Sequence, residues 1–229
     1  MISVILPTYN EKKNIAIISK KLLRIKLINE IIFVDDRSID GTFSEIKKLK
    51  FRKIKGFVRK AKSRDLSKSV MYGVKKAKND YVLVMDCDLQ HNTKYIEKLW
   101  RKIYFSRCDI VVANRFTGKK YSENLGMIRS LLSKFAIGTI NLFFGKKTSD
   151  PLSGFFICKK AIFLRYDKKF YLKGYKILFD LIYNGKKGIK VKEQDIVFNK
   201  RFYEKSKFNL YVIWLFLLQM LYTKFVVKK

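Results

Sequence analysis

Residues 81–91 read YVLVMDCDLQH, a short apolar run that ends in two carboxylates separated by one residue. An apolar run of this length, bounded by polar residues, is typical of a buried β-strand. The same succession occurs twice earlier: residues 2–6 lead to a polar cluster at 8–11, and residues 31–34 lead to a pair of aspartates. Strands that end in polar side chains predict a sheet with a ligand site along one edge.

Outward from these strands, apolar runs alternate with stretches of helical periodicity through the first half of the chain. Strands are predicted at residues 2–6, 31–34, 54–58, 81–85 and 109–113. Helices are predicted at residues 14–27, 42–49, 67–77 and 93–104, the second opening on a capping box of Thr42 and Glu45. This alternation favours an α/β fold with a mostly parallel sheet and right-handed crossovers.

The second half of the chain has a different pattern, without internal repeats or low-complexity linkers. Predicted segments are a long apolar and basic stretch at 122–144, a loop entering a strand at 150–158, a short helix at 174–183, a strand at 189–198 and a nearly all-apolar end at 208–227.

Composition excludes several classes of protein. The 229 residues are 48% hydrophobic, which is too apolar for a disordered chain. Three scattered cysteines form no disulfide framework and match no zinc spacing. A single histidine argues against a histidine-built metal site or a Ser-His-Asp triad, so any metal would need carboxylates.

The charge is strongly basic, with 51 Lys and Arg against 19 Asp and Glu and a formal net charge of +32. Such a charge suits nucleic acid, an anionic membrane surface or a polyanionic substrate. A general bias in composition is the alternative, because lysine is spread along the whole chain. A nucleic-acid-binding protein has no use for acidic strand ends, so no nucleic acid is expected as a partner.

Asp86 and Asp88 are the strongest local indication of chemistry. Two carboxylates just past a strand can approach one hard cation, and Mg²⁺ or Mn²⁺ takes one or two carboxylates plus substrate phosphates. Gln90 can add an amide oxygen. The alternative is a pair of loop aspartates that caps the next helix.

The clusters after the first two strands suit a nucleoside. Residues 7–11, PTYNE, offer a ring and hydrogen-bonding groups, and Asp36 begins a turn that can hold base and ribose. The alternatives are a helix N-terminus capped by Asn10 and an ordinary tight turn.

Taken in order, these segments resemble family 2 glycosyltransferases of the GT-A fold. The resemblance is carried by PTYNE at 7–11, VDDRSIDGT at 34–42 and MDCDLQH at 85–91. Later segments are similar to the dolichyl-phosphate (polyprenyl-phosphate) mannose synthase branch: NRF at 114–116, Arg129 with Ser133, SDPLSGFF at 149–156, GYKIL at 174–178, and Arg201 with SK at 206–207. The resemblance covers about residues 2–208.

The resemblance implies inverting transfer from a nucleotide sugar, GDP-mannose in that branch, to a polyprenyl (dolichyl) phosphate. It assigns nucleotide-sugar binding to Pro7, Tyr9, Glu11, Val34, Asp36, Asp86, Asp88, Gln90, Arg115, Arg201 and Lys207. It assigns Mg²⁺ or Mn²⁺ to Asp86, Asp88 and Gln90, and the acceptor phosphate to Arg115, Arg129 and Ser133. Asp88, Arg115 and Arg129 would be catalytic. The nearest alternatives are a hexosyltransferase that uses a UDP-sugar and an inactive member that serves as a scaffold.

The chain departs from the pattern at four positions. Arg37 stands where the family usually has glycine or a small residue, and Asp65 replaces a usual glycine. Glu204 and Lys205 replace the glycine and the acidic residue usual before the Ser-Lys pair. These changes affect the expected loop geometry and leave the expected reaction unchanged.

Two apolar stretches suit a membrane surface. Residues 122–145 are predicted as a membrane-facing amphipathic helix on which Arg129 and Ser133, four residues apart, face one acceptor phosphate; a buried core helix is the alternative. Residues 208–229 are predicted as a hydrophobic, amphipathic tail outside a catalytic domain of residues 1–207. The 12 residues at 211–222, apolar except for Gln219, extend about 18 Å, short of a ~30 Å hydrocarbon layer. An interfacial helix is therefore favoured over a transmembrane anchor or a core contact.

The first residues lead directly into a strand without a basic segment, so no signal peptide is expected. The predicted site of action is the cytoplasmic face of a membrane, to which the chain attaches peripherally or weakly through its C-terminal helix.

Overall fold

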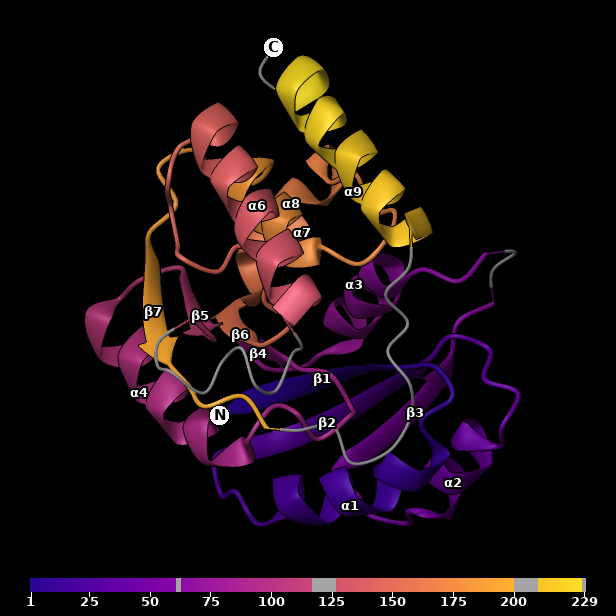
Figure 1. Ribbon diagram of the computed structural model, residues 1–229. Coiled ribbons are helices and arrows are strands. Elements are labelled where there is room, and N and C mark those ends of the chain that lie inside the picture. The colour runs from indigo at the N-terminus through magenta and orange to yellow at the C-terminus, as the bar shows by residue number, and fades with distance from the viewer. Residues whose placement is uncertain (61–62, 117–126, 200–209, 228–229) are drawn as a thin grey trace.

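The computed structural model (Figure 1) describes residues 1–60, 63–116, 127–199 and 210–227. Its centre is a seven-stranded sheet with the order β3-β2-β1-β4-β6-β5-β7. The strands are β1 Ile2–Thr8, β2 Ile28–Asp35, β3 Ile54–Val58, β4 Tyr81–Val84, β5 Ile110–Asn114, β6 Phe156–Lys159 and β7 Val191–Asp195.

The sheet is mostly parallel, as predicted. Strands β1 to β4 pair in parallel with one another, and β5 pairs in parallel with β7. Strand β6 runs antiparallel to both β4 and β5 and joins the two parallel parts. The predicted α/β class is therefore confirmed.

Helices cover both faces of the sheet. They are α1 Lys12–Leu23, α2 Thr42–Lys48, α3 Leu66–Lys76, α4 Ile96–Ser106, α6 Met127–Phe144, α7 Lys160–Tyr166, α8 Ile177–Tyr183 and α9 Leu210–Tyr222. Apolar residues of α1, α2 and α4 pack on one face, and those of α3, α7 and α8 pack on the other. Strand β1 serves both cores, because Val4 and Leu6 face the first and Ile5 faces the second.

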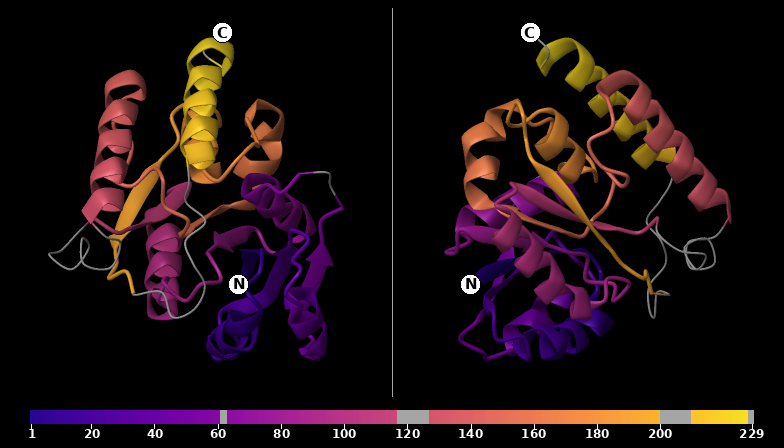
Figure 2. Two further views of the ribbon diagram at one scale, coloured as in Figure 1. Left: turned by 45° about the vertical axis from the view of Figure 1, so that its right-hand side comes forward. Right: turned by 90° about the vertical axis from the view of Figure 1, so that its left-hand side faces the viewer.

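Helices α6 and α9 stand together on the side of the molecule away from α1 and α2, as Figures 1 and 2 show. Ile140 of α6 and Phe216 and Met220 of α9 form a third core cluster with Leu152 and Phe179. Helix α9 continues into a π-helical turn, Thr223–Val227. No helix in the described part of the chain combines the length and apolarity that a bilayer span requires.

The side of α9 that faces away from the protein is apolar as well. Tyr211, Trp214 and Leu217 are 63%, 58% and 46% exposed. The only polar side chain in the middle of the helix, Gln219, points inward, where its Nε2 donates to the Lys176 carbonyl over 3.1 Å. The predicted C-terminal helix is therefore present, while its predicted separation into polar and apolar faces is not confirmed.

Two local expectations were wrong, and one helix was missed. Helix α1 ends at Leu23 rather than residue 27, where the chain turns with Ile25 N–H donating to the Leu22 carbonyl. The predicted capping box is absent, because the N-cap of α2 is Gly41 in a left-handed conformation, and the Thr42 hydroxyl accepts instead from the Glu11 N–H. Helix α7 was not predicted.

Candidate active site

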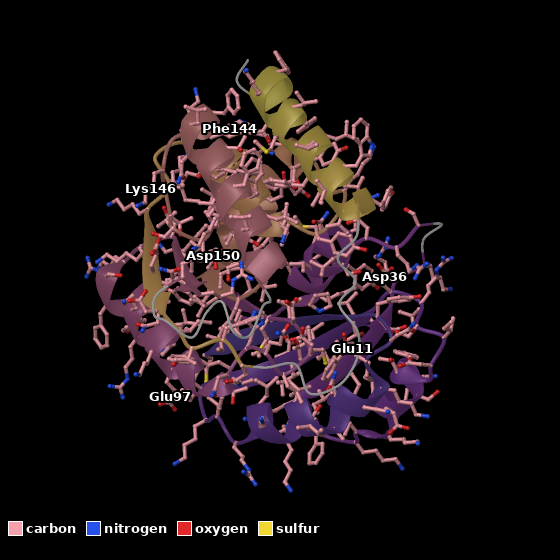
Figure 3. All side chains as sticks on the ribbon, in the orientation of Figure 1. Glu11, Asp36, Glu97, Phe144, Lys146 and Asp150 are labelled. Atoms are coloured by element: carbon pink, nitrogen blue, oxygen red, sulfur yellow. The ribbon has the colours of Figure 1, made fainter. Side chains whose placement is uncertain are left out.

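The polar segments that follow the strands meet at one edge of the sheet. Thr8 of β1 lies opposite Asp35 of β2, and Asp35 lies opposite Val58 of β3. Because these strands are parallel and in register, their carboxyl ends coincide. Figure 3 shows Asp36 and Glu11 in the right half of the view, Asp150 beside the lower part of α6, and Glu97 at the lower left, away from Asp36 and Glu11.

The loop after β4 presents the two predicted metal-binding carboxylates. Asp88 is buried, with its Oδ1 accepting from the Gln90 N–H over 3.1 Å, whereas the Asp86 side chain is 39% exposed. Leu89, between Asp88 and Gln90, adopts a positive φ of 64°. The Gln90 amide donates to the Asn199 carbonyl, so the segment after β7 closes over this loop.

His91 fixes the position of Asp86. Its Nδ1 accepts from the Asp86 N–H over 3.1 Å, which places the ring proton on Nε2, 4.0 Å from Asp86 Oδ2. The ring stacks on Phe155 with centroids 5.0 Å apart. Burial lowers the pKa of His91 and outweighs the opposing pull of Asp86 and Asp88. The ring is therefore neutral at physiological pH.

The side-chain oxygens of Asp86, Asp88 and Gln90 fit a cation that also binds substrate phosphates. Among the described residues, no three His, Cys, Asp or Glu side chains gather closely enough to hold a metal ion by themselves. Mg²⁺ and Mn²⁺ need only one or two carboxylates when phosphates complete the shell. Gly154 leaves room beside Asp86, because a Cβ there would lie 2.8 Å from Asp86 Oδ2.

The loops after β1 and β2 are joined by side chain to backbone hydrogen bonds. The Asn10 N–H donates to Ser38 Oγ over 2.8 Å, and the Ile39 N–H donates to Asn10 Oδ1 over 3.0 Å. Asn10 and Arg37 both have positive φ, of 52° and 60°. Arg37 thus occupies a conformation that favours glycine, which agrees with its being a departure from the family pattern.

The other predicted nucleoside residues differ in accessibility. Pro7 and Val34 lie opposite each other within β1 and β2 and are buried. Tyr9 is half-buried, and the guanidinium of Arg64 lies 4.4 Å from its ring centroid. Glu11 is buried and accepts from Asn14 Nδ2 over 2.7 Å.

Asp36 is held by a partner that the sequence did not indicate. Its Oδ1 accepts from Arg59 Nη2 over 2.6 Å, and its Oδ2 accepts from the Asp65 N–H over 2.6 Å. All three residues are at most 6% exposed. Arg59 directly follows the predicted strand at 54–58, so the rule applied to the other strand ends would have found it.

Arg115 forms a two-point ion pair with Asp150. The guanidinium donates from Nε to Oδ2 over 2.7 Å and from Nη2 to Oδ1 over 2.9 Å. Asp150 is fully buried. Its loop is held by Glu193 of β7, whose Oε1 accepts from the Thr148 hydroxyl and from the Ser149 N–H. Asp150 lay within a segment singled out in the sequence, whereas no sequence pattern pointed to Glu193.

The described part of the structure does not place the remaining predicted residues at this edge of the sheet. Ser133 is half-buried on α6. Arg129 lies in the same helix, but its side chain is outside the described part of the chain. Arg201 and Lys207 lie outside the described residues. Their roles stay predictions.

Comparison with known proteins identifies the family. The profile of Glycosyl transferase family 2 matches residues 3–167. The chain is 35% identical over 210 residues, 90% of its length, to a dolichol-phosphate mannosyltransferase of Pyrococcus furiosus, of which it spans 58%. It is 31% identical over 193 residues, 79% of its length, to a dolichol-phosphate mannosyltransferase of Saccharomyces cerevisiae, of which it spans 69%. The chain therefore belongs to glycosyl transferase family 2, and within that family it is similar to dolichol-phosphate mannosyltransferases.

Solved structures agree on the fold. Glucosyl-3-phosphoglycerate synthase from Mycobacterium tuberculosis, crystallised with Mn²⁺ and UDP-glucose, superposes with a TM-score of 0.75 over 98% of this chain and 79% of its own, at 14% identity. This similarity confirms the predicted GT-A architecture.

Proposed function

We propose that this chain transfers mannose from GDP-mannose to a polyprenyl (dolichyl) phosphate with inversion at the anomeric carbon. The observation that carries the proposal is that Asp86 and Asp88 follow β4, and that Arg115, paired with Asp150, follows β5, at the same edge of the sheet because both strands run antiparallel to β6. Both dolichol-phosphate mannosyltransferase relatives support this acceptor and this sugar. In this proposal, residues 1–207 form the catalytic domain, and residues 208–229 form the tail.

The donor would lie along the edge from Asp36 to Asp88. Tyr9, Glu11 and Asp36, with the backbone near Pro7 and Val34, surround the nucleoside end. Asp86, Asp88 and Gln90 would hold Mg²⁺ or Mn²⁺ together with the diphosphate. When bound, the cation neutralises the charge that develops on the departing nucleoside diphosphate.

The acceptor needs no strong general base. A phosphate monoester has a second pKa near ~6, so its oxygen is already an anion at neutral pH. That oxygen forms a bond to the anomeric carbon while the bond from this carbon to the diphosphate breaks, and one in-line displacement inverts the centre. Arg115, Arg129 and Ser133 would bind the acceptor phosphate, and Arg201 and Lys207 would offset repulsion between the two substrates.

The exposed side chains of α6, α9 and the π-helical turn after α9 suit a lipid acceptor. We define them as the apolar surface, which consists of Leu131, Leu132, Phe135, Leu142, Phe143, Tyr211, Trp214, Leu217, Leu221 and Phe225. These residues are 40–80% exposed, and patches of this kind mark membrane or protein contacts. An anionic membrane at its cytoplasmic face would attract this basic chain and supply the acceptor.

A donor panel tests the reaction. Membranes containing the protein are incubated with labelled GDP-mannose or UDP-glucose, and label in the organic phase is counted. UDP-glucose is included because structures of similar fold contain UDP-sugars. Transfer from GDP-mannose is expected. Transfer from UDP-glucose alone would mean that the donor is a UDP-sugar and not GDP-mannose. No transfer from either would contradict the proposal.

Asp88→Asn supplies the matched test of the metal role. We expect it to reduce transfer at least hundredfold while the protein stays folded, and excess chelator to do the same to the wild type. Asp109→Asn is the control, because both aspartates are 4% exposed, and Asp109 binds Lys159 and Lys186 away from the site. Full activity of the Asp88 variant, or in excess chelator, would remove the metal role.

A further inference from the structure

Asp65 replaces a glycine that is usual in the family, and in this chain it joins three parts of the molecule. Its backbone N–H donates to Asp36 Oδ2 over 2.6 Å. Its side chain caps α3, with Oδ1 accepting from the Lys68 N–H over 3.1 Å. The other oxygen, Oδ2, accepts from the Gly174 N–H over 3.1 Å, across 109 residues of sequence.

The contact with Gly174 is reinforced by Ser67. Both the backbone N–H and the hydroxyl of Ser67 donate to the Gly174 carbonyl, over 3.0 and 3.1 Å. The N–H and the carbonyl of Gly174 are therefore both bonded to the first turn of α3. Arg59, the ion-pair partner of Asp36, is tied to the same turn, because its Nε donates to Ser69 Oγ over 3.2 Å.

The opposite side of Gly174 is occupied by helix α9. Gly174 has a φ of +93°, and a Cβ at this position would lie 3.4 Å from Leu215 Cβ. Two residues on, the Lys176 carbonyl accepts from Gln219 of α9. The segment 172–176 thus lies between the C-terminal helix on one side and the Asp36–Arg59–Asp65 cluster on the other.

We infer that Asp65 is a positioning residue. It links the packing of α9 against Gly174 to nucleotide binding at Asp36, because it holds Asp36 and Arg59 in place. This inference rests on the proposed function, because it needs a nucleotide at Asp36. The coupling depends on the aspartate, since glycine at position 65 would have no side chain to bond to Gly174. Helix α9, part of the apolar surface, then affects donor binding as well as membrane contact.

The test is titration of the full chain with GDP and with UDP in the presence of Mg²⁺. Asp65→Asn retains an N-cap oxygen for Lys68, and asparagine caps helices as well as aspartate. Its amide nitrogen faces the Gly174 N–H, however, so that hydrogen bond is lost. We expect the dissociation constant for the nucleotide to rise about tenfold, as for one lost hydrogen bond to a charged group, with the KM for polyprenyl phosphate unchanged.

Gly174→Ala disturbs the same contact from the α9 side, and Gly188→Ala is its matched control. Both glycines have positive φ, but a Cβ at Gly188 would meet nothing within 4 Å. We expect Gly174→Ala to weaken nucleotide binding and Gly188→Ala to leave it unchanged. In the combined Asp65→Asn and Gly174→Ala variant, the dissociation constant for the nucleotide should rise by less than the product of the two single increases. The reason is that both substitutions remove the same contact.

The outcomes separate this inference from the proposed function. If the wild type binds neither nucleotide, the proposed function and the inference both fail. If the wild type binds and the Asp65 and Gly174 variants bind equally well, or if their effects multiply, only the inference is overturned. Thermal melting establishes that each variant is folded, and Asp65→Ser, which offers one cap oxygen and no second acceptor, replaces the Asn variant if that one does not fold.

Discussion

At the scale of single residues, charged side chains of the candidate site form ion pairs with each other. Asp150 holds Arg115 through two nitrogens, and Arg59 holds Asp36. Burying such pairs is costly in desolvation, so they add little net stability. They do fix the orientation of a planar guanidinium, which matters where a phosphate must be bound at a set angle.

Replacing Asp150 should therefore affect the acceptor more than the donor. Asp150→Asn removes one charge and one of the two acceptors from the pair, which weakens the hold of this side chain on the guanidinium of Arg115. We expect the KM for polyprenyl phosphate to rise about tenfold, the effect of one weakened charge-assisted hydrogen bond. Initial rates measured with each substrate varied in turn give this value.

Asp109→Asn serves as the control for this prediction. Asp109 is buried at the start of β5, at the other end of the strand from Arg115, and binds Lys159 and Lys186. Its substitution should lower the melting temperature and leave both KM values unchanged. Equal changes in KM for the two variants would mean that loss of stability, not the position of Arg115, causes the effect.

At the scale of elements, the central strands were predictable because burial on both faces makes strands such as β1 and β5 nearly continuous apolar runs, whereas the edge strands β3 and β7 are only partly buried. Residues 54–58 were predicted and observed with the same bounds, and the other strands differ at their ends by a few residues. The partners of the site residues were not predictable in this way. Arg59 lies 23 residues from Asp36, and Asp150 lies 35 residues from Arg115, so tertiary structure rather than local sequence brings them together.

The predicted capping box failed for a related reason. The sequence motif at Thr42 and Glu45 describes a local interaction, but a tertiary contact competes for the Thr42 hydroxyl. This hydroxyl accepts from the Glu11 N–H and donates to Asp40 Oδ1. Local patterns therefore identified most elements of this chain and the polar residues at the strand ends, while contacts between loops decided how those residues are held.

Glu30 joins three strands at the opposite edge of the sheet from the site. This buried carboxylate of β2 accepts from Ser3 of β1, from Lys55 of β3 and from the Lys78 N–H. Desolvation is the largest single influence and raises its pKa, but the hydrogen bonds from Lys55, Lys78 and Ser3 together outweigh it. The pKa of Glu30 is thus lowered below its ordinary 4.5.

Glu30→Gln should consequently destabilise the protein in a pH-dependent way. A carboxylate with a lowered folded pKa contributes stability above its unfolded pKa of 4.5, and this contribution is lost as the pH falls through the folded value. We expect a loss of about 1.5–3 kcal/mol in the free energy of unfolding at pH 7. Urea titrations should show the difference shrinking below pH 4.5, and a difference independent of pH would contradict this account.

At the scale of the whole molecule, the two sides of the fold carry different surfaces. Helices α1 and α2 expose lysines, among them Lys13, Lys20, Lys21, Lys47 and Lys48. The apolar surface of α6 and α9 lies on the side away from them (Figure 2). Lys224 links its two halves, with its Nζ 4.6 Å from the ring centroid of Phe143. Charge spread over the molecule can attract an anionic membrane, but most of the large apolar side chains that the structure describes as exposed belong to the apolar surface.

A charge placed on the apolar surface should therefore weaken membrane binding in a way that depends on position. Trp214→Glu and Leu217→Glu put a carboxylate on the outward side of α9, where the wild-type side chains are 58% and 46% exposed. Each apolar side chain that inserts is stabilised by roughly 25 cal/mol per Å² removed from water. We expect both variants to float with anionic liposomes less than the wild type does, and the loss to be clearest in high salt.

Phe105→Glu separates insertion from general charge. Phe105 is 78% exposed on α4, away from the apolar surface, so this variant changes net charge by the same amount as Trp214→Glu. If insertion through α9 anchors the protein, the Phe105 variant floats like the wild type in high salt, because screening removes the electrostatic term and leaves the apolar one. Equal losses for the Phe105 and Trp214 variants would show that only charge holds the protein at the membrane. Unchanged flotation of all three variants would place the anchor outside the exposed side of α9.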